Sequence, residues 1–143
     1  MTNSQGSSTT NYDVVIVGAG FAGLTAVHRM RELGFSTRLY EAGSDVGGTW
    51  YWNRYPGAQC DIEAYIYLPL LEELGYMPTE KYSHAPEILK HSKAIGQHFD
   101  LEDNTLFQTE VTGMKWDDEA NRWIGSTNRN DKIRARYVAR ANG

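Results

Sequence analysis

Residues 12–41, YDVVIVGAGFAGLTAVHRMRELGFSTRLYE, are the stretch that decides the fold. The run at 14–17 is apolar and β-branched, which is typical of a parallel strand buried on both faces. Gly18, Gly20 and Gly23 follow with the spacing G-x-G-x-x-G, which permits a tight turn, close approach of a pyrophosphate and close helix packing. Strand, glycines and helix in this order predict a dinucleotide-binding βαβ unit; the alternative is a glycine-rich turn in another α/β protein.

The helix predicted after these glycines has an N-terminus that suits an anion. Its first N–H groups lack partners within the helix, and the helix dipole is positive there. Leu24, Val27, Met30 and Leu33 recur at helical spacing, and Gly34 is a suitable left-handed residue to end the helix. We therefore expect one face of this helix to pack on the sheet.

A second strand is predicted over residues 36–40, and Glu41 stands at its end, eighteen residues after Gly23. A carboxylate at this place can accept hydrogen bonds from ribose hydroxyl groups. We expect the Glu41 side chain to be exposed and to make few packing contacts. Its removal is then expected to weaken cofactor binding much more than folding.

Length, composition and net charge limit the classes of protein to which this chain can belong. The 143 residues, 41% of them hydrophobic, fit one modest domain with a core. The net charge of −4 and the dispersed basic residues argue against nucleic acid or an acidic membrane surface as a partner. Without a long apolar run or a signal-peptide pattern, a cytoplasmic protein is expected. The first eleven residues are small and polar and are expected to form a disordered tail, with the domain at 12–143.

Metal-ligating patterns are weak in this sequence. Cys60 is the only cysteine, which argues against a disulfide within the chain and a thiolate metal site. His84, His91 and His98 recur every seven residues, with no matching acidic pair at ligand spacing. We expect a solvated histidine face, no metal site, and an exposed His28 on the first helix.

Residues 43–61, GSDVGGTWYWNRYPGAQCD, are the second informative stretch. The density of glycine and aromatic residues predicts an ordered loop, neither helix nor strand. Gly47 and Gly48 allow backbone to approach a ligand, while aromatic side chains such as Trp50 cover either a ligand or the core. Asp61 is either a site residue or the N-cap of the segment that follows it.

The remainder of the chain predicts short turns, one helix and a group of strands. Residues 63–82 are irregular, and a helix is expected from Ser83 or His84 to near Asp100. Residues 105–141 alternate like strands, which predicts a three-stranded antiparallel meander whose last strand continues into the main sheet. Arg140 in that strand must find a carboxylate or point out from an edge.

A family resemblance adds to this pattern. GGTWYWNRYPGAQCD, with GAGFAGL and Glu41 before it, resembles the flavin-binding N-terminal region of Baeyer–Villiger monooxygenases, within the flavin-containing monooxygenases. The resemblance covers about residues 12–143. It implies an α/β, Rossmann-like FAD-binding βαβ unit with a parallel sheet and the inserted meander. It also implies FAD and NADPH as cofactors, and oxidation of a ketone with O2 to an ester or lactone in the complete enzyme.

The same resemblance assigns site residues. The pyrophosphate is expected to lie along Gly18, Gly20, Ala22 and Gly23, and the adenosine ribose at Glu41. Other expected cofactor contacts are Gly47, Gly48, Thr49, Trp50, Tyr67 for the flavin and Val111 for the adenine. A third group, expected to approach NADPH, is Gln59, Cys60 and Asp61. Asp61 also lies near the flavin in this interpretation and is the catalytic candidate. The family often has arginine where Gln59 stands, so that position lacks the usual charge.

Two other functions stay open at this point. An N- or S-oxidising flavin monooxygenase uses the same flavin domain, and a non-catalytic flavin-binding fragment fits the short length. The sequence contains no second G-x-G-x-x-G for NADPH and no family signature motif. We therefore expect the isolated chain to be inactive as an oxygenase.

Overall fold

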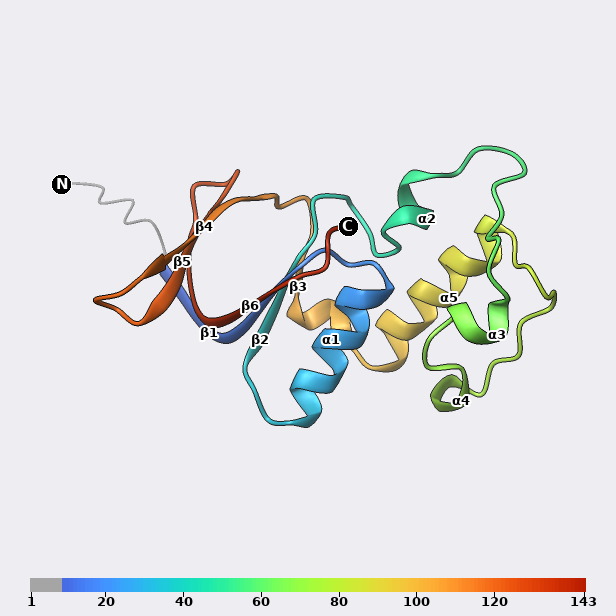
Figure 1. Ribbon diagram of the computed structural model, residues 1–143, viewed down its shortest axis with the longest axis horizontal. Coiled ribbons are helices and arrows are strands. Elements are labelled where there is room, and N and C mark those ends of the chain that lie inside the picture. The colour runs from blue at the N-terminus through green and yellow to red at the C-terminus, as the bar shows by residue number, and fades with distance from the viewer. Residues whose placement is uncertain (1–8) are drawn as a thin grey trace.

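The computed structural model describes residues 9–143, which form a single mixed sheet with helices against it (Figure 1). The strands are β1 (Thr9–Val17), β2 (Thr37–Tyr40), β3 (Thr105–Leu106), β4 (Val111–Asp117), β5 (Arg122–Thr127) and β6 (Lys132–Arg140). The helices are α1 (Phe21–Glu32), α2 (Thr49–Trp52), α3 (Ala64–Tyr67), α4 (Leu71–Leu74), α5 (Ala85–His98) and the 3-10 turn η1 (Leu101–Asn104). The predicted α/β class is confirmed.

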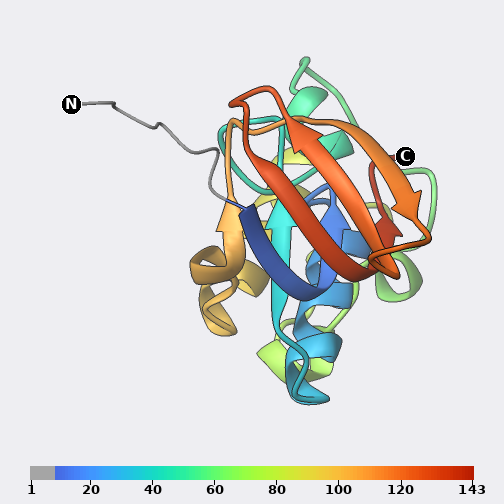
Figure 2. The same cartoon turned by 90° about the vertical axis from the view of Figure 1, so that its left-hand side faces the viewer.

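The strand order is β3-β2-β1-β6-β5-β4, and β6 joins the two halves of the sheet. It runs parallel to β1 and antiparallel to β5, and β4 then pairs antiparallel with β5. Figure 2 shows the antiparallel strands lying in front of the parallel ones. The predicted meander is therefore confirmed, and its last strand does continue into the parallel sheet. In register, Val17 lies opposite Tyr40 on one side and Arg140 on the other.

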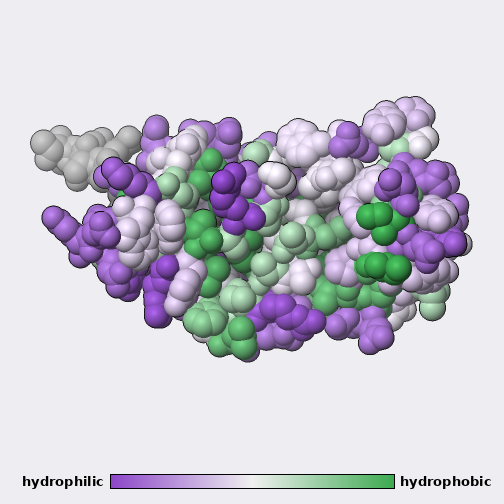
Figure 3. Space-filling model, viewed as in Figure 1, coloured by the Kyte–Doolittle hydropathy of each residue, from purple (hydrophilic) through white to green (hydrophobic). Residues whose placement is uncertain are grey.

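Each face of the parallel strands has its own core. The face towards α1 and α5 buries apolar side chains from strands and helices, among them Val14, Ile16, Leu24, Val27, Leu39 and Ile95. The opposite face, under the meander, buries Val15, Tyr40, Ile133 and Ala135. A third cluster packs α2, α3 and their loops on α5 around Trp50, Leu68 and Ile88. Figure 3 shows hydrophilic residues over the meander end and a band of neutral and apolar residues across the middle.

Several predictions for the first unit need correction. Thr9 to Asn11 belong to β1 and pair with β6, so the expected tail is too long, and its residues 1–8 lie outside the described part. Leu33 is 68% exposed instead of packing on the sheet. His28 was expected at the surface but is buried, because its ring stacks on Phe99 with centroids 3.8 Å apart.

The long helix α5 was predicted well, but its histidines were not. It begins after His84, and Ile88, Ser92 and Ile95 are fully buried as the spacing predicted. His84 and His98 are exposed, whereas His91 is buried with its Nε2 2.7 Å from the carbonyl oxygen of Pro69. The expected solvated histidine face is therefore wrong at His91.

Residues 9–143 contain neither a metal-binding cluster nor a membrane-spanning helix. In that range there is no group of three His, Cys, Asp or Glu side chains placed to hold a metal ion. None of the helices described is both long and apolar enough to cross a membrane.

Candidate functional site

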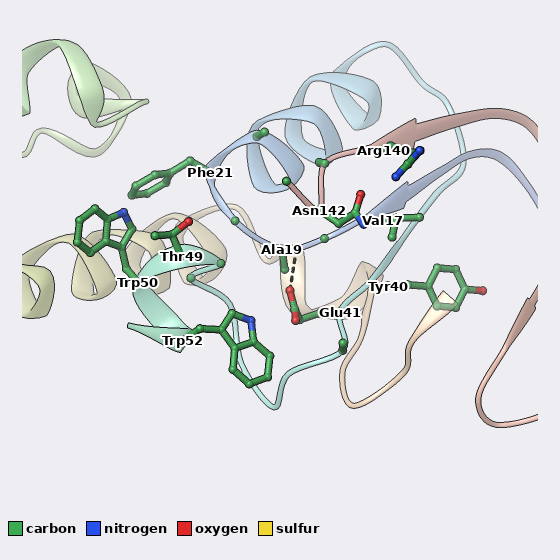
Figure 4. Close-up of a pocket in the computed structure, with 18 of the residues that line it drawn as sticks. Val17, Ala19, Phe21, Tyr40, Glu41, Thr49, Trp50, Trp52, Arg140 and Asn142 are labelled. Atoms are coloured by element: carbon green, nitrogen blue, oxygen red, sulfur yellow. Dashed lines mark hydrogen bonds between the residues drawn. The ribbon is translucent and has the colours of Figure 1, made fainter. Parts of the chain in front are cut away.

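A cavity of about 780 Å³ opens at the carboxyl ends of β1, β2 and β6 (Figure 4). Ligands of open α/β sheets bind at this edge, where adjacent loops leave room between them. Nine predicted contacts line it: Gly18, Gly20, Ala22, Glu41, Gly47, Gly48, Thr49, Trp50 and Tyr67. Val111, the expected adenine contact, lines it as well. The structure thus brings together residues from four separate segments of the chain.

The first glycine loop is closed by contacts that leave no room for side chains. Gly18 has φ +104°, and a Cβ there meets the carbonyl oxygen of Ala141 at 2.6 Å. Gly23 lies behind the cavity wall, where a Cβ meets the carbonyl oxygen of Gly18 at 1.7 Å. Leu24 N donates to Gly20 O at 3.0 Å, and the N–H groups before Leu24 in α1 have no backbone partner among residues 9–143. This helix terminus is a suitable place for a phosphate group.

The second glycine loop packs backbone to backbone against the first. Gly47 N donates to Ala19 O at 2.9 Å. Gly48 has φ +54°, and a Cβ on it lies 2.8 Å from the Cα of Gly20. The one-turn helix α2 follows at once, so the prediction that this stretch contains no helix is wrong. Where the two loops meet at Gly20 and Gly48, no side chain intervenes, which fits the close approach of backbone to the anionic pyrophosphate of a dinucleotide.

Glu41 connects the loops, contrary to its expected exposure. Its side chain is buried, with the residue only 5% exposed. Oε1 accepts a hydrogen bond from Ala19 N at 2.9 Å, which Figure 4 marks, and Oε2 accepts one from Gly43 N at 2.6 Å. A carboxylate has about four acceptor positions, so about two remain for hydroxyl groups in the cavity. Glu41 therefore links the two loops by hydrogen bonds and also has acceptor positions left for a ligand.

Aromatic residues close the other end of the cavity. Trp50 is buried and donates from Nε1 to the Tyr67 hydroxyl at 2.9 Å. Phe21 meets the Tyr67 ring edge to face, with centroids 5.7 Å apart. Both interpretations of the aromatic loop hold here, because Trp50 belongs to a core cluster and also lines the cavity. Trp52 lines the same cavity but is 63% exposed.

Gln59, Cys60 and Asp61 lie apart from this cavity. They line a second pocket of about 330 Å³ together with Tyr82. Gln59 Nε2 donates to the Tyr82 carbonyl oxygen at 2.8 Å, Cys60 is buried and Asp61 is exposed. The alternative role of Asp61 as an N-cap is wrong, since α3 begins at Ala64 with Glu63 before it.

Some cavity residues were missed by the sequence reasoning. Thr109 and Glu110 precede β4, and the buried Thr109 donates from its backbone N to Glu41 O at 2.9 Å. The loop has no periodicity or motif that could have placed it beside Glu41. Tyr40 was expected only as a strand residue, and burial raises the pKa of its phenol. Arg140, the residue without an obvious place in the strand, is exposed at the cavity wall.

Comparison with known proteins agrees with this geometry. The family described as "NAD(P)-binding Rossmann-like domain" matches residues 16–91. The chain belongs to this Rossmann-like family. The match covers the end of β1, both glycine loops, Glu41 and the first half of α5. The end of β1, the glycine loops and Glu41 are among the parts that line the cavity.

Longer relatives resemble almost the whole chain. Pentalenolactone D synthase of Streptomyces exfoliatus is 54% identical over 137 residues, which are 94% of this chain and 24% of that protein. A Baeyer–Villiger monooxygenase of Streptomyces coelicolor is 51% identical over 132 residues, 92% of this chain and 22% of that protein. The chain of this Rossmann-like protein therefore spans about a quarter of the length of these curated relatives.

Solved structures give the same picture. An oxidized steroid monooxygenase bound to NADP superposes with a TM-score of 0.86 at 47% identity, covering 94% of this chain and 26% of that one. The OTEMO complex with FAD and NADP superposes with a TM-score of 0.86 at 30% identity, covering 92% of this chain and 26% of that one. The predicted resemblance to the flavin-binding region of Baeyer–Villiger monooxygenases is confirmed.

Proposed function

We propose that this chain is the FAD-binding part of an NADPH- and O2-dependent Baeyer–Villiger monooxygenase. The observation that carries the proposal is the continuous cavity from Val111 past Glu41 and the glycine loops to Tyr67. Its volume of about 780 Å³ lies in the usual range of small-molecule and cofactor pockets. Relatives whose names are Baeyer–Villiger monooxygenase, and neighbours bound to FAD and NADP, support this choice.

The residues present fit a dinucleotide held along this cavity. The uncapped N–H groups of α1 bind the pyrophosphate, and the spare acceptors of Glu41 bind the ribose. The backbone floor at Gly20 and Gly48 lets the cofactor lie close, while Tyr67 stands by the flavin. Bound FAD supplies the redox chemistry, and this chain supplies binding, orientation and exclusion of water.

Asp61 keeps its proposed role at the reactive end, with Gln59 and Cys60 next to it on the NADPH side. Support comes from the family resemblance and from their common pocket of about 330 Å³ with Tyr82. In the complete enzyme the partners are NADPH, O2 and a small ketone. Names such as polycyclic ketone monooxygenase among the relatives favour ketone oxidation over N- or S-oxidation. A cytoplasmic location, without nucleic acid or membrane partners, remains a prediction from composition.

The first test is cofactor binding by the chain itself. FAD is added to the purified chain, and flavin absorption that stays with the protein after gel filtration is measured. Gly48→Ala is expected to abolish binding, since its Cβ lies 2.8 Å from the Cα of Gly20. Gly57→Ala is the matched control, with φ +84° and nothing within 4 Å of its Cβ in the described residues. Tight NADP binding with no flavin binding to the parent contradicts the proposal.

The second test concerns turnover. The isolated chain, given FAD, NADPH, O2 and a cyclic ketone, is expected to form no lactone at enzyme rates. Holding reactants in position is equivalent to an effective molarity on the order of 10⁵ M or more. Because this chain covers only about a quarter of the length of its relatives, we expect most of that positioning to be lost. Rapid lactone formation by the chain alone refutes the fragment interpretation. In a complete enzyme that carries these residues, oxidation of a thioether but not of the ketone favours the S-oxidising alternative.

A further inference from the structure

We infer that Arg140 is a further cofactor-positioning residue, whose guanidinium group stacks on the adenine ring of the bound nucleotide. The inference rests on the proposed function, since it needs a dinucleotide in the main cavity. It gives a role to a charged side chain that strand patterning leaves unexplained.

The sheet register fixes where Arg140 emerges. Arg140 lies opposite Val17, and Val17 lies opposite Tyr40, so the three side chains leave the sheet on one face. That face is the one under the meander, because Tyr40 and Val138, two residues before Arg140, pack in the meander-side cluster. Figure 4 shows Arg140 at the end of β6, beside Val17. Arg140 therefore enters the cavity from the side away from α1.

The hydrogen-bond donors and acceptors along the cavity indicate which part of a nucleotide each section would bind. The glycine loops and the N-terminus of α1 form the phosphate end. Glu41 follows at the end of β2, and its backbone oxygen accepts from Thr109 N at 2.9 Å. Thr109 is followed by Glu110 and then by Val111, the first residue of β4. A nucleotide with its phosphate on α1 and its ribose at Glu41 thus directs its base to the space between Val111 and Arg140.

The chemistry of this space fits a flat ring. The apolar side chains of Val17 and Val111 form part of the cavity wall. Tyr40, the last residue of β2, also lines the cavity. Arg140 is exposed, and its guanidinium takes part in none of the hydrogen bonds or ion pairs found within residues 9–143. A guanidinium group is planar and weakly hydrated, so it stacks on aromatic rings better than an ammonium group does. Glu110 lines the same cavity, but its carboxylate is exposed and forms no ion pair with Arg140 among the described residues. The guanidinium group is therefore available to the base.

The test compares two substitutions of Arg140 with a control on the same strand. Arg140→Met removes the planar cation but keeps a long stem, and Arg140→Lys keeps the charge without the plane. Arg136→Met is the control, because exposed Arg136 contacts Tyr137 and Asp13 and does not line the cavity. Dissociation constants for FAD and ADP are measured by calorimetry at low and high salt. Circular dichroism and urea midpoints confirm that each variant folds.

Both Arg140 variants are expected to bind FAD and ADP about three- to thirtyfold more weakly, with little dependence on salt. Arg136→Met is expected to match the parent. If Arg140→Lys keeps full affinity with a steep salt dependence, the arginine meets a phosphate and the stacking inference is overturned. Parent-like affinity of both variants overturns it too, while leaving the proposed function intact. A parent chain that binds neither FAD nor ADP overturns both proposals.

Discussion

Replacement of Glu41 by alanine is the most direct test of how the site is built. The change removes two hydrogen bonds to a carboxylate, from Ala19 N at 2.9 Å and Gly43 N at 2.6 Å. Hydrogen bonds to charged groups contribute about 1.5–3 kcal/mol each, which sets an upper range of about 3–6 kcal/mol for the pair. Water that enters from the cavity compensates in part, so we expect a loss of about 3 kcal/mol. Against a typical stability of about 5–15 kcal/mol, such a loss is large.

The measurement is urea unfolding at pH 7, followed by circular dichroism, for the parent and two variants. Glu41→Gln keeps one acceptor oxygen and turns the other position into a donor, so it is expected to lose about half as much stability as Glu41→Ala. The glutamine variant, still folded, then reports on binding, with FAD affinity expected to fall about ten- to a hundredfold. An unchanged urea midpoint in Glu41→Ala would refute the bracing role. Unchanged FAD affinity in Glu41→Gln would remove Glu41 from the ribose contact.

Two further predictions concern packing and pH. Gly23→Ala puts a Cβ 1.7 Å from the main-chain oxygen of Gly18 and is expected to cost about 3 kcal/mol or more in urea unfolding. Gly34→Ala, whose Cβ meets nothing within 4 Å in the described residues, is expected to cost only about 1 kcal/mol for its φ of +84°. Burial raises the pKa of Glu87, but hydrogen bonds led by those from Thr79 outweigh it and hold the pKa below 4.5. The ionised group therefore stabilises the fold above about pH 4.5 and ceases to do so as pH falls through the lowered pKa, so Glu87→Gln should flatten the acid loss of urea midpoint. A variant that loses stability in acid as steeply as the parent contradicts this role.

The features that sequence predicted well are those carried by neighbouring residues. The apolar run before Gly18, the glycine spacing and the end of α1 at Gly34 are local patterns, and they fix β1, α1 and β2. Strand alternation likewise predicted a three-stranded meander within residues 105–141, where β4, β5 and β6 lie. Local geometry decides these elements, so a single sequence is enough to recognise them.

The features that sequence missed depend on contacts between distant residues. Nothing near His91 in the chain signals Pro69, whose carbonyl oxygen holds the buried imidazole. His28 is buried for the same reason, since Phe99 comes from the far end of α5. Glu41 was recognised by its spacing, but its two backbone donors could only be seen once the loops were folded together.

The position of β6 in the sheet has a consequence for synthesis of the protein in a cell. β1 gains its partner β2 early, but its other side pairs along eight positions with β6, which begins about 115 residues after β1 ends. At about 5–20 residues per second, a ribosome takes roughly 6–23 seconds to translate that interval. Throughout that time the nascent chain presents one unpaired edge of its most apolar strand, which is a template for aggregation. Translation speed and chaperone access between residues 17 and 132 should therefore affect the yield of folded protein.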